Sequence, residues 1–279
     1  MIKRILLALD VDSDTIVATD FAVEIARRYD AEITGLAVVD TGSIEAGTRG
    51  AGIGSMYYAE KLRESLTAET RAKARELIDQ FESVVTKKNV AYEVAVHEGV
   101  PYRRILEDIK YHDLLVVGRE PHFFYGRPDH KTDTLSRVVK EATGPGLVVG
   151  ETRERAERVM VAYDGSPASA RTAQYFLHLL PFGRDIEVEI VNVHDGNEAE
   201  SELMLDMMAT YYSKHGLRAR KTSIRGDDPA RIITEHALNM ECDVIVAGAH
   251  SVSKIKELAF GSTTASLLAN CPRPMFLYT

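Results

Sequence analysis

DVIVAGAHSVSKIKELAFGSTT, residues 243–264, is the stretch that decides the fold. Its first five residues form a short and almost continuous apolar run, which is typical of a strand covered on both faces in a parallel sheet. Gly248 ends this run, and Gly-Ser-Thr at residues 261–263 opens a second apolar segment with helical spacing. The stretch therefore predicts a buried strand, a polar loop and a helix for which Ser262 or Thr263 is the expected N-cap.

A loop framed by Gly248 and Gly261 suits the phosphates of a nucleotide. Glycines let the backbone approach an anion closely, and the free N–H groups and dipole of a helix start favour negative charge. The alternative is that Gly248 is a turn glycine and that Gly261 merely precedes a capped helix, because short glycine motifs often arise by chance. The rest of the chain helps to decide between these interpretations.

The composition indicates a globular protein of one large or two ordinary domains. The chain has 279 residues, of which 45% are hydrophobic and 27% charged. It has no uninterrupted apolar stretch of about 18 residues, and its start turns acidic too early for a signal peptide, so we expect a cytoplasmic location. The net charge of −8 disfavours non-specific binding to nucleic acid or to an anionic membrane.

The sequence predicts no metal site. The two cysteines, Cys242 and Cys271, lack the spacing of a zinc site, and we interpret them as two buried free thiols rather than a pair. His122 and His130 raise the possibility of a metal or catalytic histidine in the polar segment 119–131. No second pair of ligands stands at a suitable spacing, so we interpret this segment as a solvated loop.

The first half of the chain alternates between strand and helix patterns. Apolar runs predict strands over residues 2–10, 31–40, 90–97, 114–118 and 146–150. Helical spacing predicts helices between them, including a long charged helix over residues 60–88. Residues 41–58 are expected to be an irregular flap. Their GAGIG sequence at residues 50–54 lies about ten residues past its strand, so it does not fit the dinucleotide fingerprint.

The same pattern begins again after a charged linker. RVMVAYD at residues 158–164 matches IKRILLALD at residues 2–10, VEIVNVHD at residues 188–195 matches ITGLAVVD at residues 33–40, and the order is kept to the end. Each half is a β-α-β-α-β-α-β-α-β array, which implies a five-stranded parallel sheet with helices on both faces. The predicted fold is α/β, with two tandem doubly wound domains.

The predicted domains are residues 1–150 and residues 157–279. In an open parallel sheet, ligands bind beyond the carboxyl ends of the strands. In the second domain Asp164 ends the first strand and Gly248 ends the fourth, so they meet if these strands are neighbours. Ser166 is the expected N-cap of the helix that follows Asp164.

Both halves resemble universal stress protein domains, and the whole chain resembles a tandem universal stress protein. ATP-binding members of that family carry Gly-x2-Gly-x9-Gly-Ser/Thr after the fourth strand. The second half has Gly248-x2-Ser251-x9-Gly261-Ser262, which keeps the spacing and replaces the second glycine by serine. The resemblance implies that the binding residues are Ala162, Asp164, Val193, Gly248, His250, Ser251, Gly261, Ser262 and Thr263.

The first half departs further from the family motif. Pro121 stands at its second position and Lys131 at its third, and proline supplies no N–H to a phosphate. Asp10 is retained as the acidic residue after the first strand. We therefore expect that the first half has lost or strongly altered its phosphate site.

The resemblance implies a stress-response or signalling protein that binds ATP or AMP in its second domain, with Mg²⁺ left open, and that regulates a conformation or a partner. One alternative is slow ATP hydrolysis or phosphoryl transfer, although no catalytic residue and no Walker lysine is found. Another is an assembly module that binds no nucleotide. We also expect the final strands, residues 146–150 and 275–279, to pair in an intrachain pseudo-dimer, since uncovered apolar edges favour aggregation, with a further homodimer left open.

Overall fold

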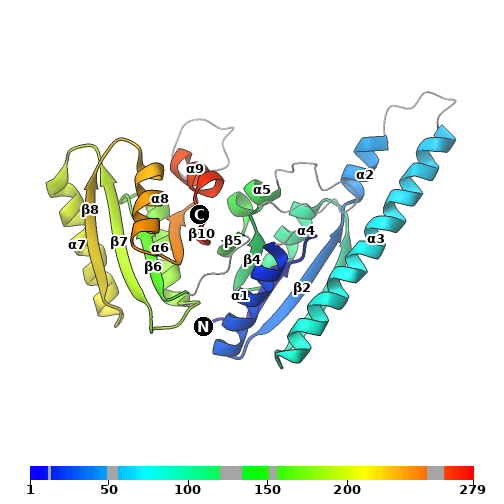
Figure 1. Cartoon of the computed structure of the whole chain (residues 1–279), viewed down its shortest axis with the longest axis horizontal. Coiled ribbons are helices and arrows are strands. Elements are labelled where there is room, and N and C mark those ends of the chain that lie inside the picture. Colours follow the sequence, from blue (N-terminus) through cyan, green and yellow to red (C-terminus); the bar gives the residue numbers. More distant parts are fainter. Residues whose placement is uncertain (12–13, 49–55, 120–133, 151–155, 250–260) are drawn as a thin grey trace. The chain divides into compact units, whose positions relative to one another are not determined.

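The structure is a computed structural model that describes residues 1–11, 14–48, 56–119, 134–150, 156–249 and 261–279. The chain divides into two compact units. The N-terminal unit is Lys3–Thr143, and the C-terminal unit is Gly144–Thr279 together with Met1–Ile2. In each unit helices cover both faces of a sheet (Figure 1).

The strands of the N-terminal unit are parallel and lie in the order β3-β2-β1-β4. Its elements are β1 (Arg4–Ala8), α1 (Asp14–Tyr29), β2 (Glu32–Val39), α2 (Thr41–Thr48), α3 (Met56–Lys87), β3 (Tyr92–Glu98), α4 (Pro101–Asp108), a 3-10 turn (Ile109–Tyr111), β4 (Leu114–Gly118) and α5 (Thr134–Glu141).

The C-terminal unit has the strand order β5-β10-β9-β6-β7-β8. Its elements are β5 (Gly146–Val149), β6 (Arg158–Ala162), α6 (Pro167–Leu179), β7 (Glu187–His194), α7 (Glu198–Lys214), β8 (Ala219–Arg225), α8 (Pro229–Asn239), β9 (Val244–Gly248), α9 (Ser262–Asn270) and β10 (Met275–Tyr278). The strands from β10 to β8 are parallel, and β5 joins β10 in antiparallel register with Val148 opposite Met275.

The predicted α/β fold with helix-covered parallel strands is confirmed. The interior strands are almost wholly apolar because helices cover them on both sides, as in β4, where every residue is buried. In the C-terminal unit α6 and α7 share one face, where the Tyr212 hydroxyl donates a 2.8 Å hydrogen bond to the carbonyl of Ala173. The helices α8 and α9 contact each other, and α8 also contacts β7.

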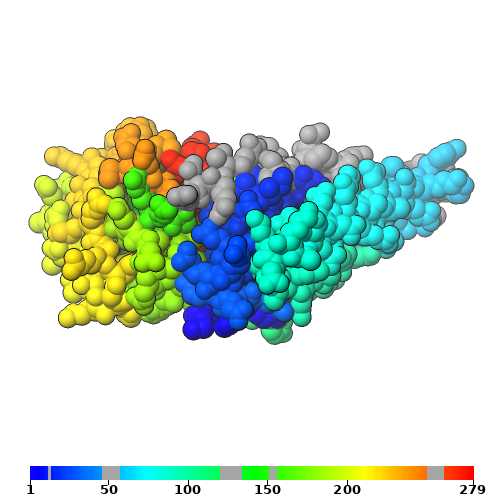
Figure 2. All heavy atoms as spheres, turned by 60° about the horizontal axis from the view of Figure 1, so that its bottom comes forward, coloured from blue at the N-terminus to red at the C-terminus, as the bar shows by residue number. Residues whose placement is uncertain are grey.

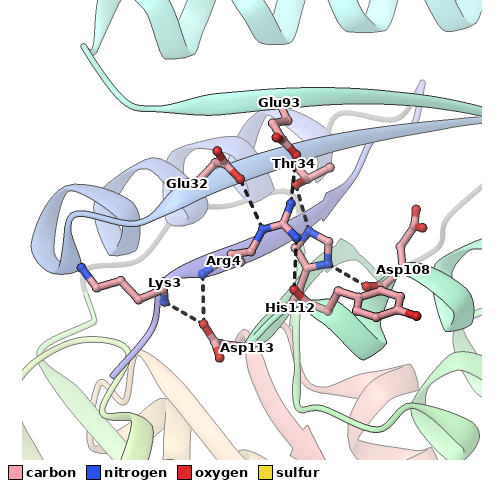
Figure 3. Close-up of polar contacts among 9 residues, drawn as sticks. Lys3, Arg4, Glu32, Thr34, Glu93, Asp108, His112 and Asp113 are labelled. Atoms are coloured by element: carbon pink, nitrogen blue, oxygen red, sulfur yellow. Dashed lines mark hydrogen bonds and ion pairs between the residues drawn. The ribbon is translucent and has the colours of Figure 1, made fainter.

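The same hydrogen-bond pattern occurs once in each unit, at equivalent positions of the sequence repeat. The carboxylate of Asp113, just before β4, accepts the backbone N–H groups of Lys3 and Arg4 at 2.7 and 3.0 Å (Figure 3). Asp243, just before β9, likewise accepts the backbone N–H of Arg158 at 2.7 Å. In both units an acidic residue at the start of the fourth strand therefore ties down the start of the first.

The strand β5 ends the predicted first domain, but its contacts lie with the second repeat. Clustering by contacts places β5 in the C-terminal unit, where it pairs with β10. Leu147 and Val148 of β5 and Phe276 of β10 are fully buried. The two final strands thus cover each other's apolar edges.

The prediction that residues 41–58 are irregular is wrong for the part that the structure describes. Residues 41–48 form α2, because the carboxylate of Asp40 caps the helix by accepting the backbone N–H of Ser43 at 2.9 Å. The GAGIG segment at residues 50–54 lies outside the described residues.

The long helix α3 begins earlier than predicted, at Met56. It can approach β2 closely because Gly35 has no side chain: a Cβ there would lie 2.6 Å from the ring of Phe81. The N-terminal part of α3 projects from its unit (Figure 2), and its side chains Tyr57 and Tyr58 are exposed.

Cys242 and Cys271 are both buried free thiols, as predicted. Burial raises the pKa of Cys242 to about 12, and its Sγ donates to the carbonyl of Val244 at 3.2 Å. No helix in the described part of the chain combines the length and the apolar character needed to cross a membrane.

Candidate functional site

A cavity of about 150 Å³ opens at the carboxyl ends of the strands in the C-terminal unit. It forms there because β6 and β9 are parallel neighbours, with Ala162 opposite Ala247. The predicted proximity of Asp164, just beyond β6, and Gly248, at the end of β9, is therefore confirmed. The start of α9 closes the cavity on one side.

The structure gathers the sequence-predicted residues at this cavity. Those that it describes all line it: Ala162, Asp164, Val193, Gly248, Gly261, Ser262 and Thr263. His250 and Ser251 lie outside the described residues. His194, the last residue of β7, does not line the cavity.

Asp164 is held in place by the first turn of α6. Its Oδ1 accepts the backbone N–H of Ser166 at 2.9 Å and the hydroxyl of Ser169 at 2.6 Å. Desolvation alone would raise the pKa of Asp164, but these hydrogen bonds outweigh it and hold the pKa below its usual range. The side chain is thus a fixed carboxylate, still exposed to solvent at the mouth of the cavity.

The turn after β6 has the predicted helix-start chemistry. Ser166 is the N-cap of α6, its Oγ accepts the N–H of Ser169 at 3.2 Å, and Pro167 stands at the first helical position. Gly165 reaches this turn with φ of 76°, a left-handed conformation that favours glycine.

The start of α9 differs from the predicted cap. Gly261, and neither Ser262 nor Thr263, is the N-cap residue, and no side-chain cap hydrogen bond is described for this helix. The first helical turn therefore begins at Ser262, and its leading N–H groups lie beyond the reach of intrahelical carbonyls. The hydroxyl of Thr264 instead donates to the carbonyl of Gly248 at 2.7 Å, which fixes the helix start against β9.

Gly248 has a structural reason to be glycine. A Cβ at this position would lie 2.8 Å from the backbone nitrogen of Ser169 and 2.9 Å from the carbonyl carbon of Ala168. The end of β9 thus packs directly on the first turn of α6. The absence of a side chain at Gly248 is what permits this close contact.

Sequence reasoning missed the polar wall of the cavity. Asn192 of β7 lines it, donates to the carbonyl of Tyr163 at 2.8 Å and accepts the hydroxyl of Ser201 at 2.7 Å. An asparagine inside the apolar run of a buried strand was the available signal. The remaining lining residues are Tyr163, Ser166, Ser169, Val191, Pro229, Ile233, Ala247, Thr264 and Leu267.

The described lining carries one charged residue, Asp164, and no lysine or arginine. Burial, together with the nearby charge of Asp164, raises the pKa of Tyr163, which stays a neutral phenol. Among the described residues no group of three or more histidine, cysteine, aspartate or glutamate side chains is arranged to hold a metal.

The described residues at the equivalent position of the N-terminal unit are more deeply buried. Asp10 follows β1 as Asp164 follows β6, yet Asp10 is only 3% exposed. Asp14, in the first turn of α1, is also buried, and its Oδ2 accepts the N–H of Arg119 just past β4 at 2.9 Å. A carboxylate of the protein therefore occupies the end of the fourth strand here. Pro121 and Lys131, at the altered motif positions, lie outside the described residues.

Comparison with known proteins places both repeats in one family. The model of the universal stress protein family matches residues 1–150 and 156–278. Universal stress protein Slr1230 of Synechocystis sp. is 24% identical over 287 residues, which cover 99% of each chain. Universal stress protein YxiE of Bacillus subtilis is 26% identical over 143 residues, 41% of this chain and 95% of its own length.

A solved structure shares the fold over nearly the whole chain. A universal stress protein from Archaeoglobus fulgidus superposes with a TM-score of 0.69 at 17% identity, covering 99% of this chain and 96% of its own. With two matching regions that together span almost all residues, the chain belongs to the universal stress protein family.

Proposed function

We propose that this stress-response protein binds one adenine nucleotide, ATP or AMP, in the C-terminal unit. The observation that supports this most is the cavity that joins a fixed carboxylate, apolar strand residues and a helix start whose N-cap residue, Gly261, has no side chain. These are the three chemistries that a nucleoside phosphate requires: hydroxyl recognition, a base pocket and an anion site.

Asp164 suits the ribose. Both of its hydrogen bonds from the first turn of α6 fall on Oδ1, so that Oδ2 can accept a hydrogen bond from a sugar hydroxyl. The depressed pKa keeps the group ionised at neutral pH, and a charged acceptor binds a hydroxyl more strongly than a neutral one.

The base would lie against the apolar part of the lining. Val193 of β7 and Ile233 of α8 supply aliphatic surface, and Asn192 beside them offers an amide that is already oriented by its bonds to Tyr163 and Ser201. A flat heteroaromatic ring gains from such mixed walls, in which apolar contacts give affinity and a few polar groups give orientation.

The phosphates would lie at the start of α9. The leading N–H groups of that helix, the hydroxyls of Ser262 and Thr263 and the helix dipole all favour an anion there. With Asp164 the one carboxylate in the described lining, a Mg²⁺ ion would be held chiefly by phosphate oxygens and water. Occupancy would act by favouring one conformation or one partner.

Two further expectations stay proposals. The antiparallel pairing of β5 with β10 supports an intrachain pseudo-dimer, because β5 belongs by sequence to the first family match and β10 to the second. A cytoplasmic location is proposed from the character of the N-terminal sequence alone.

The experiment that tests the function is mass spectrometry of the purified and then denatured protein. We expect ATP or AMP to be released in an amount that approaches one per chain. The reference is the Gly261→Val variant, whose added side chain would fill part of the cavity that Gly261 lines. Absence of released nucleotide, together with no binding of added ATP or AMP, would contradict the proposal and favour an assembly module.

A further inference from the structure

The edge strand β3 of the N-terminal unit is open on one side. It pairs with β2 along its whole length, and no other described strand lies beside it. The carbonyl of Ala91 accepts a hydrogen bond from β2 and the N–H of Gly99 donates one to it, so odd-numbered residues between them point their backbone groups at β2. The groups that point to the open edge belong to Tyr92, Val94, Val96 and Glu98.

This edge is apolar where its counterpart is charged. Val94 and Val96 are 45% and 50% exposed. On β8, the corresponding edge of the C-terminal unit, the residue aligned with Val94 is Lys221, which pairs with Glu202 at 2.9 Å and with Asp206 at 2.7 Å. Lysine on an edge strand discourages pairing with another chain, whereas exposed valines favour it.

We propose that β3 pairs antiparallel with β3 of a second copy of this chain, about a two-fold axis through Ala95. In this register Val94 lies opposite Val96 of the second copy, and Tyr92 lies opposite Glu98. All four residues point their backbone groups at the open edge, so each opposed pair exchanges two hydrogen bonds. The symmetry repeats every pair, and the four valines meet on one face of the joined sheet.

The polar residues on the other face favour this register over its neighbours. With the axis at Ala95, the carboxylate of Glu93 lies opposite the imidazole of His97 of the second copy, where the two can form a hydrogen bond, and the pair occurs twice. A shift that centres the axis on Val94 or on Val96 keeps the hydrogen-bond parity but places Glu93 or His97 opposite Ala95. The favourable pair is then lost.

The side chains of this pair are already oriented. Glu93 is held at 2.9 Å by Arg4, which reaches across from β1, as Figure 3 shows. His97 is held at 3.1 Å by the carboxylate of Asp108. Both are more than one third exposed, so the second copy would meet ordered but accessible groups. Ordering in advance lowers the entropy lost on association.

The helix above β3 is compatible with this approach. Arg71 of α3 bonds Glu98 at 2.7 Å, which identifies the flank of the helix that lies toward β3. Helical spacing puts Arg75 and Glu82 on the same flank. An antiparallel second copy would bring the basic stretch of one α3 toward the acidic Glu82 of the other, so the helices do not repel each other.

Measuring the mass of the whole chain in solution tests the proposal. Light scattering or sedimentation over a range of concentrations should show a reversible dimer. Val94→Lys and Val96→Lys should each weaken dimerisation about tenfold or more, because each change places lysine at the interface twice. The control Leu203→Lys alters a residue that is 63% exposed on α7 and should leave the dimer intact. Unfolding curves would verify that all variants fold.

A cross-link tests the register. Ala95→Cys should form a covalent dimer under mild oxidation, since the axis places this residue opposite itself at about 4.5 Å between Cα atoms. Val94→Cys should form far less, because its diagonal partner lies about 7 Å or more away. The native Cys242 and Cys271 are buried. A single-chain mass at every concentration, a dimer unchanged by Val94→Lys, or equal cross-linking by the two cysteine variants would each overturn the proposal.

Discussion

The strands β3-β2-β1-β4 of the N-terminal unit and β8-β7-β6-β9 of the C-terminal unit lie in the same order, but the residues at their carboxyl ends differ in exposure. Beyond β6 the carboxylate of Asp164 is exposed at the mouth of a cavity, whereas beyond β1 the carboxylate of Asp10 is 3% exposed. The order of four strands repeats, but the exposure of the acidic residue does not. The difference lies in a few side chains at the carboxyl edge and leaves the sheet unchanged.

Particular substitutions explain this contrast. Leu9 is fully buried in the N-terminal unit where the C-terminal unit has the half-buried Tyr163. Asp14 replaces Ala168 in the first turn of the following helix and fills the end of the fourth strand with its own carboxylate. Buried Leu9 and Asp14 thus stand where the C-terminal unit has Tyr163 and Ala168, while the order of the surrounding strands is the same.

The largest effect should come from filling the open site in the same way. Gly261 has φ of −59°, which any residue adopts, so Gly261→Val adds bulk to the cavity without backbone strain. We expect about a hundredfold loss of nucleotide affinity, the equivalent of about 3 kcal/mol of overpacking. Calorimetric titration would measure it.

The matched control for that variant is Gly146→Val. It adds the same side chain to β5, where no described atom outside the adjacent residues lies within 4 Å of the added Cβ, and Gly146 does not line the cavity. Its affinity should equal that of the native chain. Unchanged affinity in Gly261→Val would remove α9 from the binding site.

A smaller effect should follow from neutralising the carboxylate. Asp164→Asn keeps the shape but donates where the native group accepts, so we expect about tenfold weaker nucleotide binding. Asp10→Asn makes the same change at the buried counterpart and should leave binding unchanged. Equal losses in the two variants, measured by the same titration, would contradict the division of roles between the units.

The smallest effect concerns pH. His112, before β4, has its pKa lowered, chiefly by burial, while its ring nitrogens contact the carbonyl of Asp108 at 2.7 Å and the hydroxyl of Thr34 at 2.9 Å. Cys242 occupies the same place before β9 and has its pKa raised to about 12, so it does not titrate in the acid range.

Because the folded pKa of His112 is lowered, the unfolded chain binds the proton more readily, and stability falls as pH drops below about 6.5. The native protein should lose a few degrees more in unfolding temperature between about pH 7.5 and about pH 5.5 than His112→Cys does. Identical pH dependence of the two proteins would show that His112 does not contribute.

The sequence supports the fold better than the local detail. Strand positions and covered faces followed from apolar runs such as β4, since burial on both faces leaves a clear pattern. The helix α2 was missed because its residues, Thr-Gly-Ser-Ile-Glu-Ala-Gly-Thr, have weak helical propensity. Its cap, Asp40, belongs to the end of a strand and was interpreted as such.

The sequence predicted the parts of the candidate site that depend on the strand and helix pattern. It did not predict those that depend on hydrogen bonds between side chains and other elements. Asp164 and Gly248 come together because β6 and β9 are neighbours, which was the condition that the strand pattern had left open. The N-cap of α9 is Gly261 and not the predicted Ser262 or Thr263. The hydroxyl of Thr264 fixes the helix start by donating to the carbonyl of Gly248, a contact between elements that residue spacing does not reveal. Asn192 needed the register of β6 and β7 before its bond to Tyr163 could be recognised.

We propose that the two units differ in nucleotide binding. Calorimetric titration of the whole chain with ATP and with AMP, after removal of any bound nucleotide, measures this difference. We expect a stoichiometry that approaches one nucleotide per chain, and an affinity about a hundredfold lower in the Gly261→Val chain. Two equivalent sites per chain, or one site that persists unaltered in Gly261→Val, would contradict it.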